Sequence, residues 1–174
     1  MIPGSLLAGP YPAGPDTEST TAILGALLDA GIESVINLTD DDEGAAAEEE
    51  LSHLVAYEDE LEALGEKRGL VVEIERFPIE PRTAPTPAAM QLVIDAIDGE
   101  IDGRNSPTLV HCLNGNGRVG MVIGCYLARH GIATGAEAIA RLNELRAANP
   151  DLAGLKCPET IVQERFVTRW KNDQ

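Results

Sequence analysis

Apolar residues follow two different spacings along this chain, and the two spacings alternate. Short runs rich in apolar and β-branched residues predict strands at residues 34–38, 70–77 and 107–111. Elsewhere apolar residues recur three and four positions apart, which predicts amphipathic helices. The residues expected on the buried faces of these helices are Ile23, Leu24, Leu27, Leu28, Met90, Val93, Ile94, Ile97, Ile101, Ile139, Leu142, Leu145, Val162, Phe166 and Trp170.

The alternation of strands and helices sets the expected fold class. It indicates an α/β fold with a mostly parallel central sheet of four to five strands, flanked by helices on both faces. A further helical pattern spans residues 48–68, and the first helix is expected to end at Gly31. Thr134 opens a capping-box pattern with the glutamate three residues later. Helix starts are expected at Asp16, Thr86, Thr134 and Pro158.

The composition favours one folded domain over residues 1–174. Of the 174 residues 44% are hydrophobic, and no spacer-like or low-complexity run divides them. The apolar stretches are too short and interrupted to cross a bilayer, and the first residues lack the basic-then-apolar order of a signal peptide. The three cysteines fit a reducing compartment better than a disulfide framework. We therefore expect a cytoplasmic protein.

The formal net charge of −16 limits the expected partners. A nucleic acid or an anionic membrane surface would be repelled at long range, so neither is expected to bind. Charges are screened over about 8 Å at physiological salt, so a local group of basic side chains can still hold a small phosphate. The sequence leaves the oligomeric state open.

Residues 110–120 hold the most specific chemical pattern of the chain. Cys112 and Arg118 are separated by five residues, two of them glycines, and the segment joins a predicted strand to a predicted helix at residues 119–129. Loop N–H groups and a helix N-terminus attract anions, and an arginine can donate to two phosphate oxygens at once. The same field favours the thiolate form of Cys112. The pattern thus predicts a phosphate held against a reactive cysteine.

This run, with His111 before the cysteine and Gly120 after the arginine, resembles the signature of cysteine-dependent protein tyrosine and dual-specificity phosphatases. The resemblance implies a phosphoric monoester hydrolase that uses no metal and no cofactor and acts through a cysteinyl-phosphate intermediate. Other segments resemble compact bacterial members of the family at residues 3–9, 35–39, 77–79 and 158–167.

The resemblance also assigns roles to individual residues. Cys112 would attack phosphorus, and Arg118 would hold the phosphoryl oxygens. His111 is expected to order the loop and tune the cysteine. Independently of the resemblance, Arg82 is expected to add positive charge to the pocket, because local charges dominate within the screening length. Gln163 matches a position that can orient the hydrolytic water; the alternative is an exposed helix glutamine. The remaining phosphate-binding residues are expected to be Leu113, Asn114, Gly115, Asn116 and Gly117.

Two positions near this pattern depart from the family. Val119 stands where most members have a serine or threonine whose hydroxyl donates to the thiolate. Losing such a bond costs about 1.5–3 kcal/mol, which would slow hydrolysis of the intermediate roughly 10- to 100-fold if that step limits turnover. Cys157 stands where serine or proline is usual, and it is expected either to form a disulfide with Cys112 or to act as a small cap residue.

A third departure concerns the general acid, the group that protonates the leaving oxygen. Similar bacterial members have an aspartate two positions after Phe-Pro-Ile, where this chain has Pro81. Glu80, one residue earlier and with a longer side chain, is the nearest replacement; the alternative is a solvated loop carboxylate. Residues 40–43 supply further carboxylates that could reach the pocket mouth.

Three functions remain open from the sequence. The first is an active phosphatase that acts on a phosphotyrosine-like protein or on a small ester such as a nucleotide, sugar or inositol phosphate. Val119 and Pro81 favour a specialised small substrate. The second function is that of a pseudophosphatase, which binds phosphorylated ligands without turning them over. The third is a different reaction in the same phosphate-binding pocket.

Overall fold

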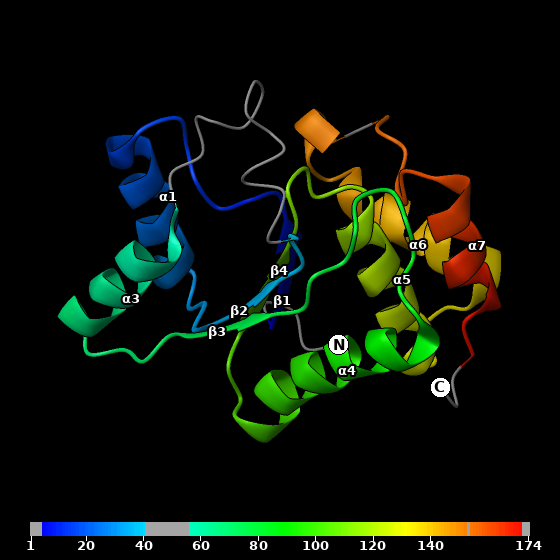
Figure 1. The fold of residues 1–174 in the computed structure, drawn as a ribbon, viewed down its shortest axis with the longest axis horizontal. Helices are drawn as coiled ribbons and strands as arrows, with labels where there is room; N and C mark the ends of the chain where they lie inside the picture. Colours follow the sequence, from blue (N-terminus) through cyan, green and yellow to red (C-terminus); the bar gives the residue numbers. More distant parts are fainter. Residues whose placement is uncertain (1–4, 41–55, 153, 172–174) are drawn as a thin grey trace.

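A parallel β-sheet forms the centre of the structure, a computed structural model that describes residues 5–40, 56–152 and 154–171 (Figure 1). In this part of the chain the sheet has four strands in the order β1-β4-β2-β3. All neighbouring pairs are parallel, as predicted. The strands are β1 (Leu6–Gly9), β2 (Ser34–Asn37), β3 (Glu73–Arg76) and β4 (Thr108–His111).

The strand register brings the carboxyl ends of the four strands to one edge of the sheet. His111 of β4 pairs with both Gly9 of β1 and Asn37 of β2, and Asn37 pairs in turn with Arg76 of β3. The segments that follow these residues therefore begin side by side. Ligands of open parallel sheets bind at this edge.

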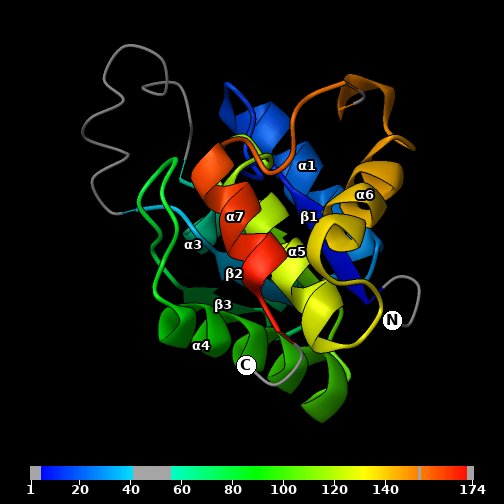
Figure 2. The ribbon, with the colours of Figure 1, turned by 90° about the vertical axis from the view of Figure 1, so that its right-hand side faces the viewer.

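Helices cover both faces of the sheet, which confirms the predicted layers (Figures 1 and 2). Val35 and Leu109 pack with α1 (Thr17–Asp29) and α3 (Glu58–Lys67) on one face. The next residues along these strands, Ile36 and Val110, belong to the larger core on the other face. The helices of that face are α4 (Pro87–Asp98), the π-helix η1 (Gly99–Gly103), α5 (Arg118–Arg129), α6 (Gly135–Arg146), the 3₁₀-helix η2 (Pro150–Leu152) and α7 (Ile161–Arg169).

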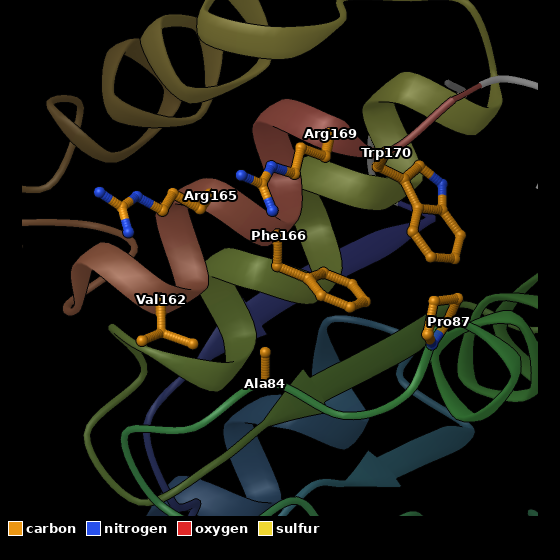
Figure 3. Close-up of a pocket in the computed structure, with 7 residues that line it drawn as sticks. All are labelled: Ala84, Pro87, Val162, Arg165, Phe166, Arg169 and Trp170. Carbon is orange, nitrogen blue, oxygen red and sulfur yellow. The ribbon is translucent and has the colours of Figure 1, made fainter.

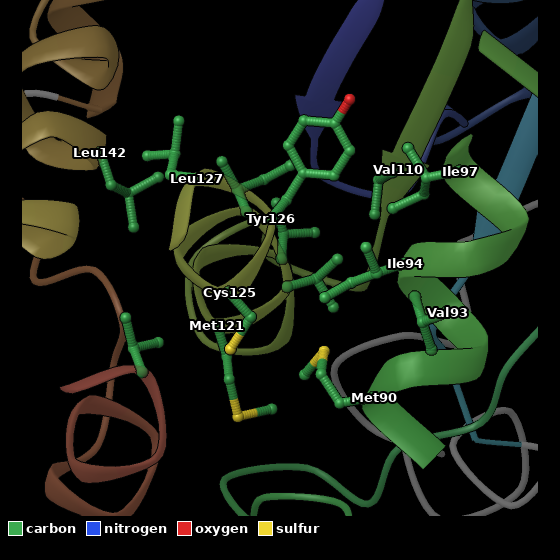
Figure 4. Close-up of a cluster of buried hydrophobic side chains, with 14 of the residues drawn as sticks. Met90, Val93, Ile94, Ile97, Val110, Met121, Cys125, Tyr126, Leu127 and Leu142 are labelled. Carbon is green, nitrogen blue, oxygen red and sulfur yellow. The ribbon is translucent and has the colours of Figure 1, made fainter. Parts of the chain in front are cut away.

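Helix α5 is the central element of the larger core. Its residues from Arg118 to Ala128 are all buried, because α4, α6, α7 and the sheet surround it. Figure 4 shows Met121 and Cys125 on the side of α5 toward Met90 of α4, with Leu142 of α6 approaching from another side. This packing fixes the N-terminus of α5 at the carboxyl edge of the sheet. None of the described helices is long and apolar enough to cross a membrane.

Three of the predicted helix starts and one predicted end are confirmed, because Asp16, Thr86 and Thr134 are the N-cap residues of α1, α4 and α6. The side chain of Asp16 accepts the N–H of Ser19 at 2.8 Å at the start of α1, and Thr86 accepts the N–H of Ala89 at 3.2 Å at the start of α4. Gly31, with a φ of +84°, follows the end of α1. Glycine adopts such an angle without steric strain, so it terminates the helix.

The predicted capping box at Thr134 is wrong. Thr134 is the N-cap residue of α6, but its side chain makes no capping hydrogen bond. Gly135 has a φ of +58°, so the first turn departs from regular helix geometry. The N–H of Glu137 bonds to the main-chain carbonyl of Thr134 at 3.1 Å instead of to its hydroxyl.

The predicted start of the last helix at Pro158 is also wrong, because α7 begins three residues later at Ile161. Thr160 is its N-cap and accepts the N–H of Gln163 through its hydroxyl, while the Gln163 side chain accepts the N–H of Thr160. This capping box places the helix start. Gln163 thus also caps the N-terminus of α7, a role that the sequence resemblance did not indicate.

Several predicted elements are shorter than expected. β3 covers only residues 73–76 of the strand predicted at residues 70–77. Val72, just before it, packs against α3, where a Cβ atom at Gly65 would lie 2.8 Å from the Val72 methyl group. The helix predicted at residues 48–68 is described from Glu58 onward, and residues 48–55 lie outside the described residues. Three predicted core residues are exposed instead, namely Ile23, Leu145 and Val162.

Candidate active site

The loop between β4 and α5 places Cys112 at the carboxyl edge of the sheet. Gly115 in this loop has a φ of +67°, and a Cβ atom there would lie 2.7 Å from the backbone of Gly9 and Pro10. The N–H of Tyr11 donates to the carbonyl of Leu113 at 3.0 Å. The loop is therefore tightly packed against the end of β1, and only glycine fits at position 115.

A cavity of about 200 Å³ opens above this loop. It brings together seven of the residues that the sequence singles out: Cys112, Leu113, Asn114, Gly117, Arg118, Arg82 and Gln163. Pro81 and Glu159 complete its lining. Gly115 and Asn116 are not among the lining residues, and neither is Glu80, whose side chain is exposed.

Arg118 is the first residue of α5 and is buried. Its Nη1 donates to the carbonyl of Leu38 at 3.3 Å and to the carbonyl of Ile79 at 3.2 Å. These carbonyls follow β2 and β3 respectively, so the guanidinium group joins three neighbouring segments at the carboxyl edge. The arrangement fixes a permanent positive charge at the wall of the cavity.

His111, immediately before the cysteine, is buried and neutral. Its Nδ1 lies 3.5 Å from the carbonyl of Cys112, and its Nε2 lies 2.7 Å from the hydroxyl of Tyr57. A carbonyl only accepts, so Nδ1 carries the proton and Nε2 accepts from Tyr57. Burial, with a smaller contribution from the positive charges of Arg118 and Arg76, lowers the pKa of His111 to about 4.

Two tyrosines, Tyr11 and Tyr57, both contact this histidine. Tyr57 and Tyr11 each pack edge-on against the His111 ring, with centroids 5.3 and 5.5 Å away. Burial and the nearby Glu58 raise the pKa of both phenols, so both keep their protons at neutral pH. Tyr57 is fully buried and orients the histidine, which is more than a packing contact.

Arg146, at the end of α6, supports the back of the loop. It donates to the carbonyl of Gly115 at 2.8 Å and to the side chain of Asn116. The sequence did not indicate this role, because a basic residue in the last turn of a helix is ordinarily explained by the helix dipole alone. Gly115 and Asn116 thus face the scaffold of the site and not its cavity.

Cys157 also contacts the loop. Its thiol donates to the carbonyl of Asn116 at 3.1 Å, and its own carbonyl accepts from Asn143 at 2.9 Å. Burial raises the pKa of Cys157 to about 11. A residue at position 120 larger than glycine would collide with its sulfur. All three cysteines are free thiols in the structure, and this packing matches the predicted small cap residue.

The segment after β3 holds the position of the missing acid. Pro81 lines the cavity, whereas the carbonyl of Glu80 accepts from the hydroxyl of Thr83 at 2.9 Å in a turn on the surface. Arg82 has a φ of +65°, an angle that is uncommon for residues other than glycine and often marks functional sites. Its carbonyl accepts from Thr160 at 3.2 Å, which ties the turn to the start of α7.

Gln163 is fully buried, so the alternative of an exposed helix glutamine is wrong. Its Oε1 accepts the N–H of Thr160 at 3.1 Å, while its Nε2 has no hydrogen-bond partner among the described residues. Both amide atoms lie 3.0 Å from the point where a Cβ atom of Gly117 would be. A buried donor without a partner beside the loop is suited to bind a ligand oxygen or a water.

The second residue of α5, Val119, is buried next to the loop. Its side chain carries no donor, as the sequence requires. Of the acidic segment expected near the mouth, residues 41–43 lie outside the described residues. Within the described part of the chain, no three His, Cys, Asp or Glu side chains are grouped so that they could hold a metal ion.

A larger cavity, about 410 Å³, lies on the neighbouring side of α7 (Figure 3). It contains no nucleophile, so the smaller cavity at Cys112 is the better candidate for chemistry. Figure 3 shows the ring of Phe166 on its floor and Arg165 and Arg169 on the same helix. Its lining residues are Ala84, Pro87, Val162, Arg165, Phe166, Arg169 and Trp170.

Comparison with known families shows to which protein family the chain belongs. A model of the dual-specificity phosphatase domain of the Swiss Army Knife proteins, PTP-SAK, matches residues 7–155, which include the loop, Arg118 and Arg82. The chain belongs to this family. The predicted family of cysteine-dependent tyrosine and dual-specificity phosphatases is thereby confirmed.

Two plant phosphatases are similar to parts of this chain. Inositol diphosphatase DSP3 of Arabidopsis thaliana is 40% identical over 55 residues, which make up 31% of this chain and 27% of the relative. The Arabidopsis protein PTEN1, a phosphatidylinositol 3,4,5-trisphosphate 3-phosphatase and protein tyrosine phosphatase, is 29% identical over 101 residues, or 57% of this chain and 23% of the relative. The matched segments span only about a quarter of these relatives.

Solved phosphatase structures share the fold. The active form of Tk-PTP has a TM-score of 0.66 and 23% identity, with 100% of this chain and 99% of that chain covered. PTPMT1 in complex with PI(5)P has a TM-score of 0.60 and 19% identity, with 95% and 91% covered. At these identities the likeness shows that the α/β fold is that of the phosphatases.

Proposed function

We propose that this dual-specificity phosphatase hydrolyses a phosphate monoester through a cysteinyl-phosphate on Cys112. The observation that carries the proposal is that the Cys112 side chain lines the same small cavity as Arg118 and the first loop residues, at the N-terminus of a buried helix. This is where an anion is stabilised by helix and guanidinium charge. A thiolate in this place is poised to attack a bound phosphoryl group.

The reaction has two steps. The Cys112 sulfur attacks phosphorus, a sulfur–phosphorus bond forms, and the bond between phosphorus and the leaving oxygen breaks as this oxygen takes a proton. A water then attacks the phosphorus, loses a proton, and releases inorganic phosphate and the thiolate. Arg118 and the loop amides hold the phosphoryl oxygens in both steps. Neither step requires a metal ion, so chelators should not change the rate.

We propose an inositol phosphate as the preferred substrate. The cavity of about 200 Å³ is smaller than the roughly 300–1,000 Å³ typical of sites that enclose a drug-sized ligand. It suits a phosphoryl group with the first atoms of its leaving group, and Arg82 at its rim suits a second phosphate. The names of the inositol diphosphatase and PTEN1 relatives, and of the PTPMT1 complex, point to the same substrate class.

Phosphate release from a substrate panel tests this function. The panel contains inositol mono- and diphosphates, a nucleoside monophosphate and a phosphotyrosine peptide, and Cys112→Ser is the control. We expect kcat/KM for an inositol phosphate to exceed that of the peptide by about tenfold or more, which corresponds to about 1.4 kcal/mol in the transition state. Faster turnover of the peptide would contradict the substrate class but not the mechanism.

A pseudophosphatase is the second candidate, and Val119 and Pro81 favour it. Both replace polar groups that the reaction uses in similar members, while Cys112 and Arg118 remain in the cavity. Such a protein would bind vanadate or phosphate at the loop and release no phosphate from any member of the panel. Measurable turnover that disappears in Cys112→Ser would exclude this candidate.

A further inference from the structure

The leaving oxygen of a phosphate ester needs a proton, and the segment after β3 does not supply one to the cavity. Pro81 lines the cavity at the position of the usual aspartate, and Glu80 does not line it. Among the described residues, Glu159 is the one carboxyl side chain in the cavity lining. It lies two residues before α7, and the residue after it, Thr160, hydrogen-bonds to the carbonyl of Arg82 at 3.2 Å, next to the expected acid position at Pro81.

Glu159 lies directly over the phosphate loop. Its Oε2 is 3.1 Å from the point that a Cβ atom of Gly117 would occupy, and the Gln163 amide atoms are 3.0 Å from the same point. The Glu159 carboxyl group and the Gln163 amide therefore both lie next to Gly117, at the end of the loop. Cys112 and Arg118 line the same cavity, so a phosphoryl group bound there would be flanked by all four side chains.

Hydrogen bonds of Cys157 and Thr160, before and after Glu159 in the sequence, fix the backbone at Glu159. The Cys157 thiol is bonded to the loop at Asn116, and the capping box of Thr160 and Gln163 fixes the start of α7. The hydroxyl of Thr160 also donates to the carbonyl of Arg82, a residue that lines the cavity. Glu159 is thus attached between two anchored neighbours, while its own side chain remains exposed to solvent and can exchange a proton.

We propose that Glu159 is the general acid of this phosphatase. In the first step the Glu159 carboxyl donates its proton to the leaving oxygen as the bond to phosphorus breaks. In the second step the resulting carboxylate takes the proton of the attacking water, whose oxygen Gln163 positions with its unpartnered Nε2. Glu159 then returns to its protonated form, and the protons balance over one turnover. This role rests on the proposed function.

The test compares leaving groups in Glu159→Gln. A poor leaving group, such as an alkyl phosphate, needs its oxygen protonated in the transition state, whereas an activated aryl phosphate does not. We expect kcat/KM for the alkyl ester to fall roughly 100- to 1,000-fold and that for the aryl ester to change by less than about threefold. Glu164→Gln is the matched control, because Glu164 lies on α7 and pairs at the surface with Lys156 at 3.2 Å.

The pH profile separates an acid from a structural residue. General acid catalysis needs a protonated group, so kcat/KM for the alkyl ester should show an alkaline limb in the wild type that is absent in Glu159→Gln. The charged and titratable groups that share the cavity are Cys112, Arg82 and Arg118. The wild type and Glu159→Gln both retain these groups, so a difference in the alkaline limb of their pH profiles is due to Glu159.

Each other outcome overturns a specific part of the account. Equal losses on both esters, or a leaving-group-dependent loss in Glu80→Gln instead, would overturn the assignment of Glu159 and leave the phosphatase function standing. A wild type that releases no phosphate even from the aryl ester would overturn the proposed function, and the role of Glu159 with it.

Discussion

The hydroxyl of Tyr57 donates a hydrogen bond to Nε2 of His111 over 2.7 Å, and both side chains are fully buried. The tyrosine comes from the start of α3, on the face of the sheet opposite to α5. The bond therefore links the smaller core to the residue that precedes the nucleophile. It holds His111 in the neutral tautomer whose Nδ1 faces the carbonyl of Cys112.

This neutral histidine makes the fold sensitive to acid. Burial lowers the pKa of His111 to about 4, from 6.5 in the unfolded chain. Between these values only the unfolded chain binds the proton, so the stabilisation is complete above about pH 6.5 and is lost as the pH falls toward 4. The loss is on the order of 3 kcal/mol. In urea unfolding at neutral and acidic pH, His111→Asn should show a weaker pH dependence than the wild type, and His130→Asn should not.

Arg146 should matter for anion binding although it does not line the cavity. Arg146→Met leaves the carbonyl of Gly115 without this charged donor, and hydrogen bonds to charged groups contribute about 1.5–3 kcal/mol. We expect vanadate affinity to fall roughly tenfold or more, measured by inhibition of aryl phosphate hydrolysis. Arg141→Met on the same helix, where the arginine pairs with Glu144 at the surface, should leave vanadate affinity unchanged.

Val119→Thr should raise kcat. A threonine hydroxyl would supply the missing donor to the thiolate at nearly constant volume, and so speed hydrolysis of the cysteinyl-phosphate by roughly 10- to 100-fold if this step is limiting. The pre-steady-state burst with an aryl phosphate should keep its rate, because the burst reports the first step. Unchanged turnover in the variant, or a wild type without a burst, would show that another step limits the reaction.

Cys112 should be the cysteine that iodoacetate alkylates first near neutral pH. Burial raises the pKa of Cys125, and that of Cys157 to about 11, so both are poor nucleophiles under these conditions. Vanadate should protect Cys112 by filling the loop. Peptide mapping identifies the labelled residue, and faster labelling of Cys157 or Cys125, or no protection, would argue against an anion site at this loop.

Much of the fold could be predicted because its signals are local. Alternating periods gave the layers and the parallel sheet, and side chains such as Asp16 and Thr86 marked helix starts. The errors arose where tertiary contacts decide. Thr134 matches a capping pattern, but the N–H of Glu137 bonds to the main-chain carbonyl of Thr134 and not to its hydroxyl. Val72 packs on α3 and precedes β3, although its β-branched side chain is typical of a strand.

In the candidate site, too, features encoded in a continuous segment could be predicted, and contacts between distant segments could not. The loop from Cys112 to Arg118 is contiguous in sequence, so its spacing predicts its place. Arg146 and Glu159 reach the loop from 28 and more residues away. No pattern marks Arg146, and the family-like segment at residues 158–167 indicated a role for Gln163 but none for Glu159. The family resemblance points to an acid in the segment after β3, and the acidic run at residues 40–43 is a further source of carboxylates, whereas the cavity is lined by a carboxyl group just before α7.

Detection of phosphate on Cys112 tests the central claim most directly. The wild type is mixed with an activated aryl phosphate, quenched rapidly, and analysed by mass spectrometry of its peptides. The account predicts one phosphoryl group on the peptide that contains Cys112, formed at the rate of the burst, and none in Cys112→Ser. Release of phosphate with no phosphorylated enzyme, or with the phosphoryl group on another residue, would contradict it.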